Sequence, residues 1–160
     1  MAPHTHNFSG GNVLKHSEAG VGRIFIVKLE DGEIVHKCLE EFAIQHNIKS
    51  AAVLAVGALN ENSRMTVGPE DKNTRPVIPL YHTLTAPHET AGVGTIFEGE
   101  DGLPRLHMHV SCGREGEGLT GCIRVGSIVW QILEVIIIEL TDCNAKKVKD
   151  KSTGFEVLEP

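Results

Sequence analysis

The chain has 160 residues, of which 41% are hydrophobic and 22% are charged, and its 21 acidic and 15 basic residues give a net charge of −6. This size and composition indicate one folded domain and exclude a disordered chain. The longest apolar stretch, residues 128–140, is too short to span a bilayer and includes Gln131 and Glu134, so we expect no membrane association. The acidic balance disfavours tight, autonomous binding to a nucleic-acid backbone.

The cysteines and the first residues indicate a compartment. Cysteines at positions 38, 112, 122 and 143 form no CxxC pair, which is typical of reduced thiols rather than of a disulfide framework. No basic segment followed by an apolar one opens the sequence, so we expect no secretory signal. Together these features predict a cytoplasmic protein.

The first predicted elements are an arm, a strand and a helix. Residues 1–21 contain several glycines and lack a hydrophobic period, so we interpret them as an N-terminal arm. Residues 23–29 are apolar and β-branched and precede the turn signal at residues 30–32, which predicts a strand. Apolar residues then recur at helical spacing over residues 34–43. This pattern predicts an amphipathic helix that ends near His46.

The next segments predict strands of one sheet. Asp101-Gly102 is a strong hairpin signal, and a polar loop with two prolines at residues 68–76 separates two of the strands. The extended segments before and after these turns are residues 51–59, 63–67, 77–85, 93–98 and 103–112.

The C-terminal part predicts a long strand and a polar tail. Seven of the thirteen residues at 128–140 are β-branched, which favours a strand, and its length predicts a bulge or bend. We interpret the lysines at positions 146, 147, 149 and 151 as part of a solvated tail. The expected fold class is α+β, with one N-terminal helix packed on a mostly antiparallel sheet.

The strongest candidate site lies on the predicted strand at residues 103–112. His107 and His109 share one face of that strand, with Cα atoms about 6.5 to 7 Å apart, so both imidazoles can reach one ion. The chain returns through residues 119–125, which brings Cys122 to the neighbouring strand. Two imidazoles and a thiolate form a plausible zinc set with an open fourth position.

Plainer interpretations stand beside this one. The two histidines can be a solvent-facing or core pair, and Cys122 can be a small buried hydrophobe. Cys112 has the opposite parity and is expected in the core. His4 and His6 form a second HxH pattern, but we expect them to fray within the terminal arm.

Three further residues are candidates for proton transfer. His88 and Glu89 follow a proline and are placed in a loop, where side chains are usually solvated. Glu134 lies among apolar neighbours, so it either needs a partner or faces water on the far side of the sheet. Catalytic residues stay unknown at this point, because the sequence contains no P-loop, GxSxG, HExxH or dinucleotide-binding pattern.

Motifs along most of the chain resemble the plants-and-prokaryotes-conserved (PPC) domain family, in its stand-alone prokaryotic type. The matching motifs, in order, are Gly22-Arg23, Asp31-Gly32-Glu33, residues 55–59 (AVGAL), 104–109 (PRLHMH), Thr120-Gly121-Cys122, 133–137 (LEVII) and 153–158 (TGFEVL). The resemblance implies a PPC-like domain at residues 22–158 and assembly as a homotrimer. It also implies that His107 and His109 match two ligands of a three-histidine metal site, with Cys122 in the place of the third.

Two functional classes remain. In the first, the chain is an assembly module with a zinc-type site, Zn²⁺ or another divalent metal, at His107, His109 and Cys122. Its DNA-binding or regulatory role rests on resemblance alone, because the AT-hook that grips DNA in plant members is missing. In the second class, the chain is a zinc-dependent enzyme or small-ligand-binding protein that uses the open metal position, with Glu134, His88 or Glu89 moving protons.

Overall fold

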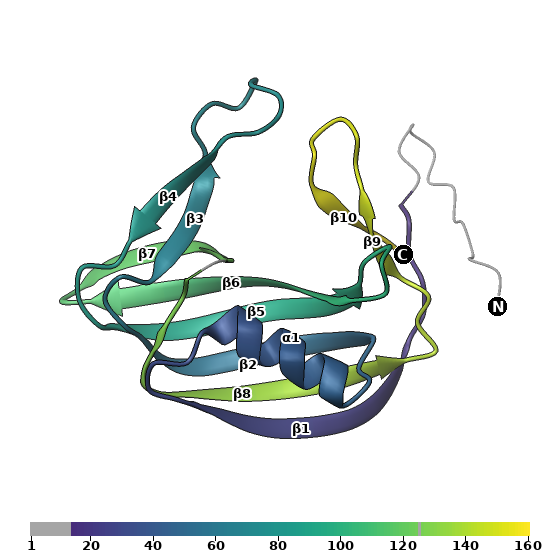
Figure 1. Ribbon diagram of the computed structural model, residues 1–160, viewed down its shortest axis with the longest axis horizontal. Helices are drawn as coiled ribbons and strands as arrows, with labels where there is room; N and C mark the ends of the chain where they lie inside the picture. Colours follow the sequence, from purple (N-terminus) through teal and green to yellow (C-terminus); the bar gives the residue numbers. More distant parts are fainter. Residues whose placement is uncertain (1–13, 125) are drawn as a thin grey trace.

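The computed structural model describes residues 14–124 and 126–160 as one helix on a large antiparallel sheet, with a separate two-stranded ribbon at the C-terminal end (Figure 1). This arrangement confirms the predicted α+β class. Residues 1–13 of the predicted arm, including His4 and His6, lie outside the described residues. No helix in the described part has the length and apolarity that crossing a membrane requires.

The helix α1 spans Val35–Gln45. The strands of the large sheet are β1 (Gly20–Glu30), β2 (Ser50–Leu59), β3 (Arg64–Pro69), β4 (Pro79–Thr83), β5 (His88–Glu98), β6 (Pro104–Arg114), β7 (Glu117–Ile123) and β8 (Val129–Thr141), and those of the ribbon are β9 (Lys146–Lys149) and β10 (Glu156–Glu159). The order in the large sheet is β1-β8-β2-β5-β6-β7-β3-β4, with every pair antiparallel.

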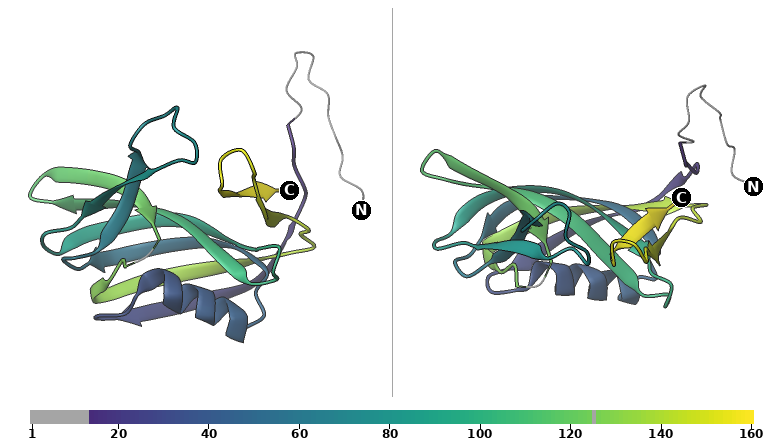
Figure 2. Two further views of the ribbon diagram at one scale, coloured as in Figure 1. Left: turned by 45° about the horizontal axis from the view of Figure 1, so that its top comes forward. Right: turned by 90° about the horizontal axis from the view of Figure 1, so that it is seen from above.

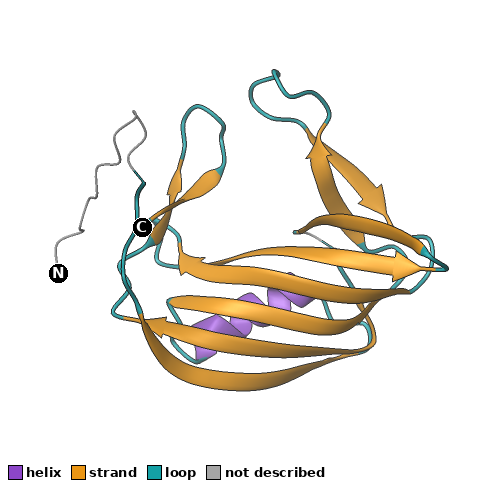
Figure 3. Cartoon of the chain, turned by 180° about the vertical axis from the view of Figure 1, so that it is seen from behind, coloured by secondary structure: helices purple, strands orange, loops and turns teal. Residues whose placement is uncertain are grey.

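The helix covers only one face of this sheet. Its apolar side, Val35, Leu39 and Ala43, is buried against inward side chains such as Val53 and Met108. Two turned views show α1 along one side of the sheet (Figure 2), and a view from behind shows the opposite face with no helix on it (Figure 3). Side chains alternate between the two faces along each strand, so every second residue of the central strands points toward the uncovered face.

Strand β8 contains the irregularity that its length predicts. Gln131 has a positive φ of 60°, and the register between β2 and β8 shifts between Gly57 and Leu59. Gly57 itself has a φ of 153°, and a Cβ there would lie 2.4 Å from the carbonyl oxygen of Ile132. The bulge therefore brings the two backbones too close together for any residue but glycine at this position.

Two sequence predictions about loops are wrong. His88 and Glu89 belong to β5, because the backbone ladder with β2 continues to the pair Leu59 and His88. The tail after Thr141 is not simply solvated, since residues 146–149 and 156–159 pair as the ribbon β9–β10. A backbone bridge between Gly99 and Lys147 places this ribbon beside the β5–β6 hairpin.

Candidate metal site and adjacent cleft

Strand β6 presents the two candidate histidines on the uncovered face of the sheet. Met108 and Val110 point to the opposite face, where both are almost completely buried. His107 and His109 are exposed, and their Nε2 atoms lie 3.2 Å apart. The alternation predicted from the sequence is confirmed, and it aims two imidazole nitrogens at one point.

The adjacent strand supplies the third side chain. Cys122 of β7 pairs directly with His109, and it is buried, with 6% of its surface exposed. The hairpin that joins β6 to β7 has two turn residues, Glu115 and Gly116, with φ values of 54° and 85°. Positive φ at both positions is typical of the type I′ turn, which fixes the register of a hairpin. The turn therefore determines that Cys122 faces the histidines.

These three side chains fit a tetrahedral divalent metal. One nitrogen of each histidine and the sulfur of Cys122 all lie within 4.8 Å of one another. With Zn–N bonds of about 2.0 to 2.1 Å, tetrahedral ligands are separated by about 3.3 Å, close to the 3.2 Å between the two Nε2 atoms. Histidine and cysteine are both good zinc ligands, and three protein ligands with an open fourth position are the arrangement of catalytic zinc sites.

The surroundings of His107 favour its neutral, metal-binding form. Burial lowers the pKa of His107 below that of a free histidine, and the nearby charges of Lys147, His109 and Arg124 lower it further. A metal must displace a proton from any protonated imidazole, so a lower pKa leaves this ligand available at neutral pH.

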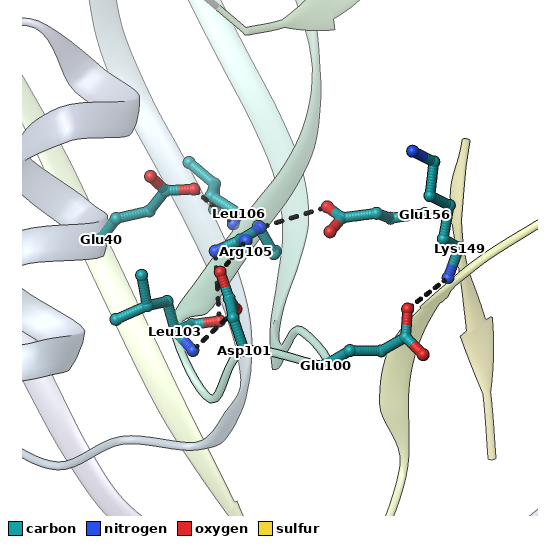
Figure 4. A network of polar contacts seen from close by, with 8 residues as sticks. All are labelled: Glu40, Glu100, Asp101, Leu103, Arg105, Leu106, Lys149 and Glu156. Carbon is teal, nitrogen blue, oxygen red and sulfur yellow. Dashed lines mark hydrogen bonds and ion pairs between the residues drawn. The ribbon is translucent and has the colours of Figure 1, made fainter. Parts of the chain in front are cut away.

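A cleft of about 900 Å³ adjoins His107 at the edge of β6. Strand β7 pairs with β6 only from Met108 onward, so residues 104–107 have no neighbour strand on that side. The carboxylate of Glu40 on α1 accepts a hydrogen bond from the backbone N–H of Leu106 there, at 2.9 Å (Figure 4). The helix, this free edge and the ribbon β9–β10 form the walls of the cleft.

Arg105 fastens the ribbon to the sheet. Its guanidinium donates to Asp101 at 2.6 Å and to Glu156 of β10 at 3.1 Å (Figure 4). The backbone N–H of Lys149 donates to Glu100 at 3.2 Å. The cleft wall is therefore held by two polar contacts between residues far apart in sequence.

Lys147 departs most from its sequence interpretation. It is only 6% exposed rather than solvated, and it lines the cleft. Burial lowers the pKa of its ammonium, Arg124 lowers it further, and Glu156 and Cys122 act in the opposite direction. Strand alternation could have predicted this burial. Neighbouring residues of a strand point to opposite faces, so Lys147 must point away from the solvent-exposed side that Lys146 occupies.

Cys112 is a core residue, as its parity predicts. It is 2% exposed, its sulfur lies 3.3 Å from the hydroxyl of Thr90, and burial raises the pKa of the thiol. A buried thiol with a raised pKa is poorly suited to metal binding or nucleophilic attack.

The proposed proton-transfer residues are not at the site. Glu134 is exposed on the uncovered face, but it lies on β8, three strand positions from β6, or about 14 Å away. Glu89 pairs with Gly113, four residues from His109, which corresponds to about 13 Å along the strand. His88 is adjacent to Glu89, and its Nδ1 contacts the carbonyl of Ala86 at 2.8 Å. None of the three can serve a metal held by His107 and His109.

A row of exposed apolar side chains on the uncovered face ends at His109. The strand registers place Ile26, Ile136, Leu54, Val93 and His109 side by side across five neighbouring strands. Ile26 is 79% exposed and Val93 is 67% exposed. An apolar row of this kind on an uncovered sheet is typical of an interaction surface.

Comparison with known proteins identifies a family and several similar folds. The sequence model of the Plants and Prokaryotes Conserved (PCC) domain, also abbreviated PPC, matches residues 16–141. A metal-containing protein from Archaeoglobus fulgidus is 25% identical, with a TM-score of 0.77 over 90% of this chain and 98% of that chain. A plant- and prokaryote-conserved (PPC) protein from Pyrococcus horikoshii is 22% identical, with a TM-score of 0.77 over 92% and 98%.

A third solved structure carries a different description. It is named "putative DNA-binding protein" from Ralstonia eutropha JMP134, and it is 22% identical, with a TM-score of 0.64 over 83% of this chain and 88% of that chain. At this identity, the Pyrococcus and Ralstonia proteins show similarity of fold alone. No curated protein matches the chain significantly.

Proposed function

Because the chain belongs to the Plants and Prokaryotes Conserved domain family, as its motifs predict, we propose that it is a cytoplasmic assembly module that binds Zn²⁺ or a similar divalent metal. His107, His109 and Cys122 hold the ion. The observation that carries the proposal is the convergence of their three ligand atoms within 4.8 Å. The description of the Archaeoglobus relative as metal-containing supports it.

The proposed domain extends over residues 22–158, with residues 1–21 as an arm. This range includes the ribbon, although the family match ends at residue 141. The ribbon belongs to the same functional unit because it forms one wall of the cleft beside the histidines. The four cysteines are unpaired, in keeping with a reducing compartment.

Zinc titration tests the site directly. Isothermal titration and elemental analysis of the wild-type chain should give about one zinc per chain. His107→Ala and His109→Ala should each abolish stoichiometric binding, whereas His82→Ala on the exposed strand β4 should bind like the wild type. The proposal would be refuted if the wild-type protein held no zinc after metal reconstitution. It would also be refuted if both His107→Ala and His109→Ala bound zinc as the wild type does.

The proposed assembly is a homotrimer built on the apolar row of the uncovered face. Ile26, Leu54 and Val93 are exposed in the single chain, and burying them against a neighbouring copy would remove apolar surface from water. The row leads to His109, so the interface would lie next to the metal site. A closed ring of three copies needs two different contact patches on each chain.

Small-ligand binding at the metal is the second candidate function, supported by the cleft that His107 lines. A bound zinc would polarise an oxygen ligand or activate water there. Among the described residues, Glu40 and Glu156 are the carboxylates that line this cleft, and both already accept hydrogen bonds, from Leu106 and Arg105. The cleft therefore favours ligand binding over hydrolytic catalysis.

Of the two roles that the relatives' names mention, DNA binding has less support in this chain than metal binding. The net charge is −6, whereas autonomous DNA-binding domains present a strongly basic surface. A gel-shift assay at about 50 mM salt, where phosphate contacts are strongest, tests this role. Retardation of a duplex probe by the pure protein would add DNA binding to the proposed function, and its absence would leave metal binding and assembly.

A further inference from the structure

Lys147 is a largely buried lysine that lines the cleft and forms no ion pair or side-chain hydrogen bond with the described residues. It is 6% exposed, and within the described part of the chain no carboxylate oxygen lies within ion-pair distance of its ammonium and no hydrogen bond to it is formed. The Lys147 ammonium is not among the fully buried polar atoms that lack a hydrogen-bond partner, so it reaches solvent in the cleft. An anion bound there would supply the ion pair that the described residues do not form.

Positive charges outnumber negative ones around Lys147. The cleft is lined by four cations and by two carboxylates, Glu40 and Glu156, and Arg105 forms ion pairs with both Asp101 and Glu156. Arg124 and Lys149 also line the cleft, and their side chains form no ion pair with any carboxylate of the described residues. This cluster of free cations belongs to a chain whose net charge is −6, so the positive charge is local to the cleft.

The proposed metal adds to this excess. Two neutral imidazoles and one thiolate leave a divalent ion with a net positive charge and an open position. Lys147 and His107 both line the cleft. An oxyanion bound there can therefore approach both the ammonium and the open metal position.

The cleft also has an apolar wall. Leu106 lines it from β6, and Phe155, Val157 and Leu158 line it from the ribbon, where each is about two-fifths exposed. A volume of about 900 Å³ lies in the range of small-molecule sites, which combine apolar walls with a few polar anchors. The Nδ1 of His36, also on this cleft, is buried and has no hydrogen-bond partner among the described residues.

We infer that this cleft binds a small organic acid, whose carboxylate lies between the Lys147 ammonium and the metal position and whose apolar body lies against Leu106 and Phe155. The inference rests on the proposed metal site for one of its two anchors. The other anchor, Lys147, is independent of the metal.

Three probes and two variants test the inference. Phenylacetate carries both parts of the expected ligand, phenylacetamide lacks the charge, and inorganic phosphate lacks the apolar body. The zinc-loaded wild type should bind phenylacetate saturably, with a dissociation constant on the order of 1 mM, as expected for a fragment. Lys147→Met should weaken this binding at least about tenfold. Lys146→Met, at the adjacent exposed position, should not change it. Phosphate should bind more weakly than phenylacetate.

Four results would overturn the inference. In two of them, phenylacetate does not bind saturably, or it binds Lys147→Met as tightly as the wild type. In the other two, phenylacetamide or phosphate binds the wild type as tightly as phenylacetate does. If Lys147→Met does not fold, amide chemical-shift changes in the wild type decide the question: they should centre on Lys147, Arg124 and His107, and changes confined to other surfaces would refute the site.

Metal-free protein separates this inference from the proposed function. Phenylacetate binding that depends on Lys147 but occurs in a chain unable to bind zinc would support the anion site and refute the metal site. Zinc binding without phenylacetate binding would support the metal site and refute the anion site. Binding of both, with phenylacetate weakened when zinc is removed, supports the two anchors together.

Discussion

His109 and Cys122 lie directly opposite each other on β6 and β7, and this pairing completes the candidate metal site. The hairpin closes at the pair Arg114 and Glu117, and successive pairs from that point bring His109 onto Cys122. A turn of a different length would offer a different residue to the histidines, on the other face of the sheet if the register slipped by one. The two-residue turn is therefore as important to the site as the ligands.

Replacing Cys122 by serine tests whether the thiolate is a ligand. Cys122→Ser should weaken zinc binding by about tenfold or more, because a neutral hydroxyl is a much poorer zinc ligand than a thiolate. In cobalt-substituted protein, the sulfur-to-metal charge-transfer absorption should disappear. Cys122→His should retain metal, since imidazole is also a good zinc ligand.

Cys143→Ser provides the matched control, because Cys143 lies outside the three-residue cluster. It should keep both the zinc affinity and the charge-transfer absorption of the wild type. Loss of that absorption in Cys143→Ser, or its persistence in Cys122→Ser, would show that the assigned thiolate is wrong.

Gly94 permits the close approach of β5 to its neighbour β6, the strand that carries the two histidines. A Cβ at this position would lie 2.7 Å from the Cβ of Met108 and 2.9 Å from the carbonyl oxygen of His107. Gly94→Ala should destabilise the fold by about 2 kcal/mol through overpacking and weaken zinc binding by displacing β6. Urea unfolding and zinc titration measure the two effects. Gly118→Ala, whose added Cβ would meet nothing closer than 4.0 Å, should have neither.

Val93 tests the proposed assembly. If the chain forms the proposed homotrimer, Val93→Asp should convert it to monomers, because a buried carboxylate at the centre of an apolar interface is strongly unfavourable. Light scattering after size-exclusion chromatography measures this change. Ile44→Asp is the control: Ile44 is 55% exposed but lies on the helix, away from the uncovered face. A wild-type chain that runs as a monomer, or a trimer that survives Val93→Asp, contradicts this interface.

The Arg23–Glu139 pair predicts a specific acid sensitivity. Two guanidinium nitrogens of Arg23 each lie 2.7 Å from a Glu139 oxygen, and these contacts lower the pKa of Glu139 from 4.5 to about 2. The unfolded chain binds this proton at a higher pH than the folded chain does, so the stabilisation is present above pH 4.5 and is lost as the pH falls toward 2.

Urea unfolding between about pH 7 and about pH 3 measures this effect. Glu139→Gln should lower the stability at neutral pH and reduce its decline on acidification. Glu41→Gln removes an exposed helix carboxylate whose contact with Lys37 is 4.0 Å long, so it should leave the acid profile almost unchanged. An unaltered profile in Glu139→Gln would show that Arg23 does not hold this carboxylate in its charged form.

Arg105 should control how firmly the ribbon closes the cleft. Arg105→Gln removes the contact with Glu156, so amide hydrogens in β10 should exchange about tenfold faster, which corresponds to about 1.4 kcal/mol in local opening. Arg114→Gln removes an arginine that binds Pro87 and Glu115, far from the ribbon. Equal exchange of β10 in both variants would mean that Arg105 does not fasten it.

The sequence was most informative where local patterns decide structure. The helical spacing of apolar residues before His46 predicted α1, and the β-branched run at 128–140 predicted β8. Each pattern depends only on residues close together in sequence. Strand alternation predicted which face His107 and His109 share. Neighbouring apolar residues could not show that Glu134 faces outward, since that depends on which face the helix covers.

The sequence by itself determined the α+β class, the parity of the two histidines and their candidate partner Cys122, since these follow from periodicity and from the chemistry of side chains. Only the tertiary structure decided that Cys122 meets His109, that Glu134, His88 and Glu89 are too distant, and that Lys147 is buried. Those facts depend on hairpin register and on the position of the ribbon beside the free edge of β6. Contacts between distant segments arise from the packing of the whole chain, and local sequence patterns do not contain them.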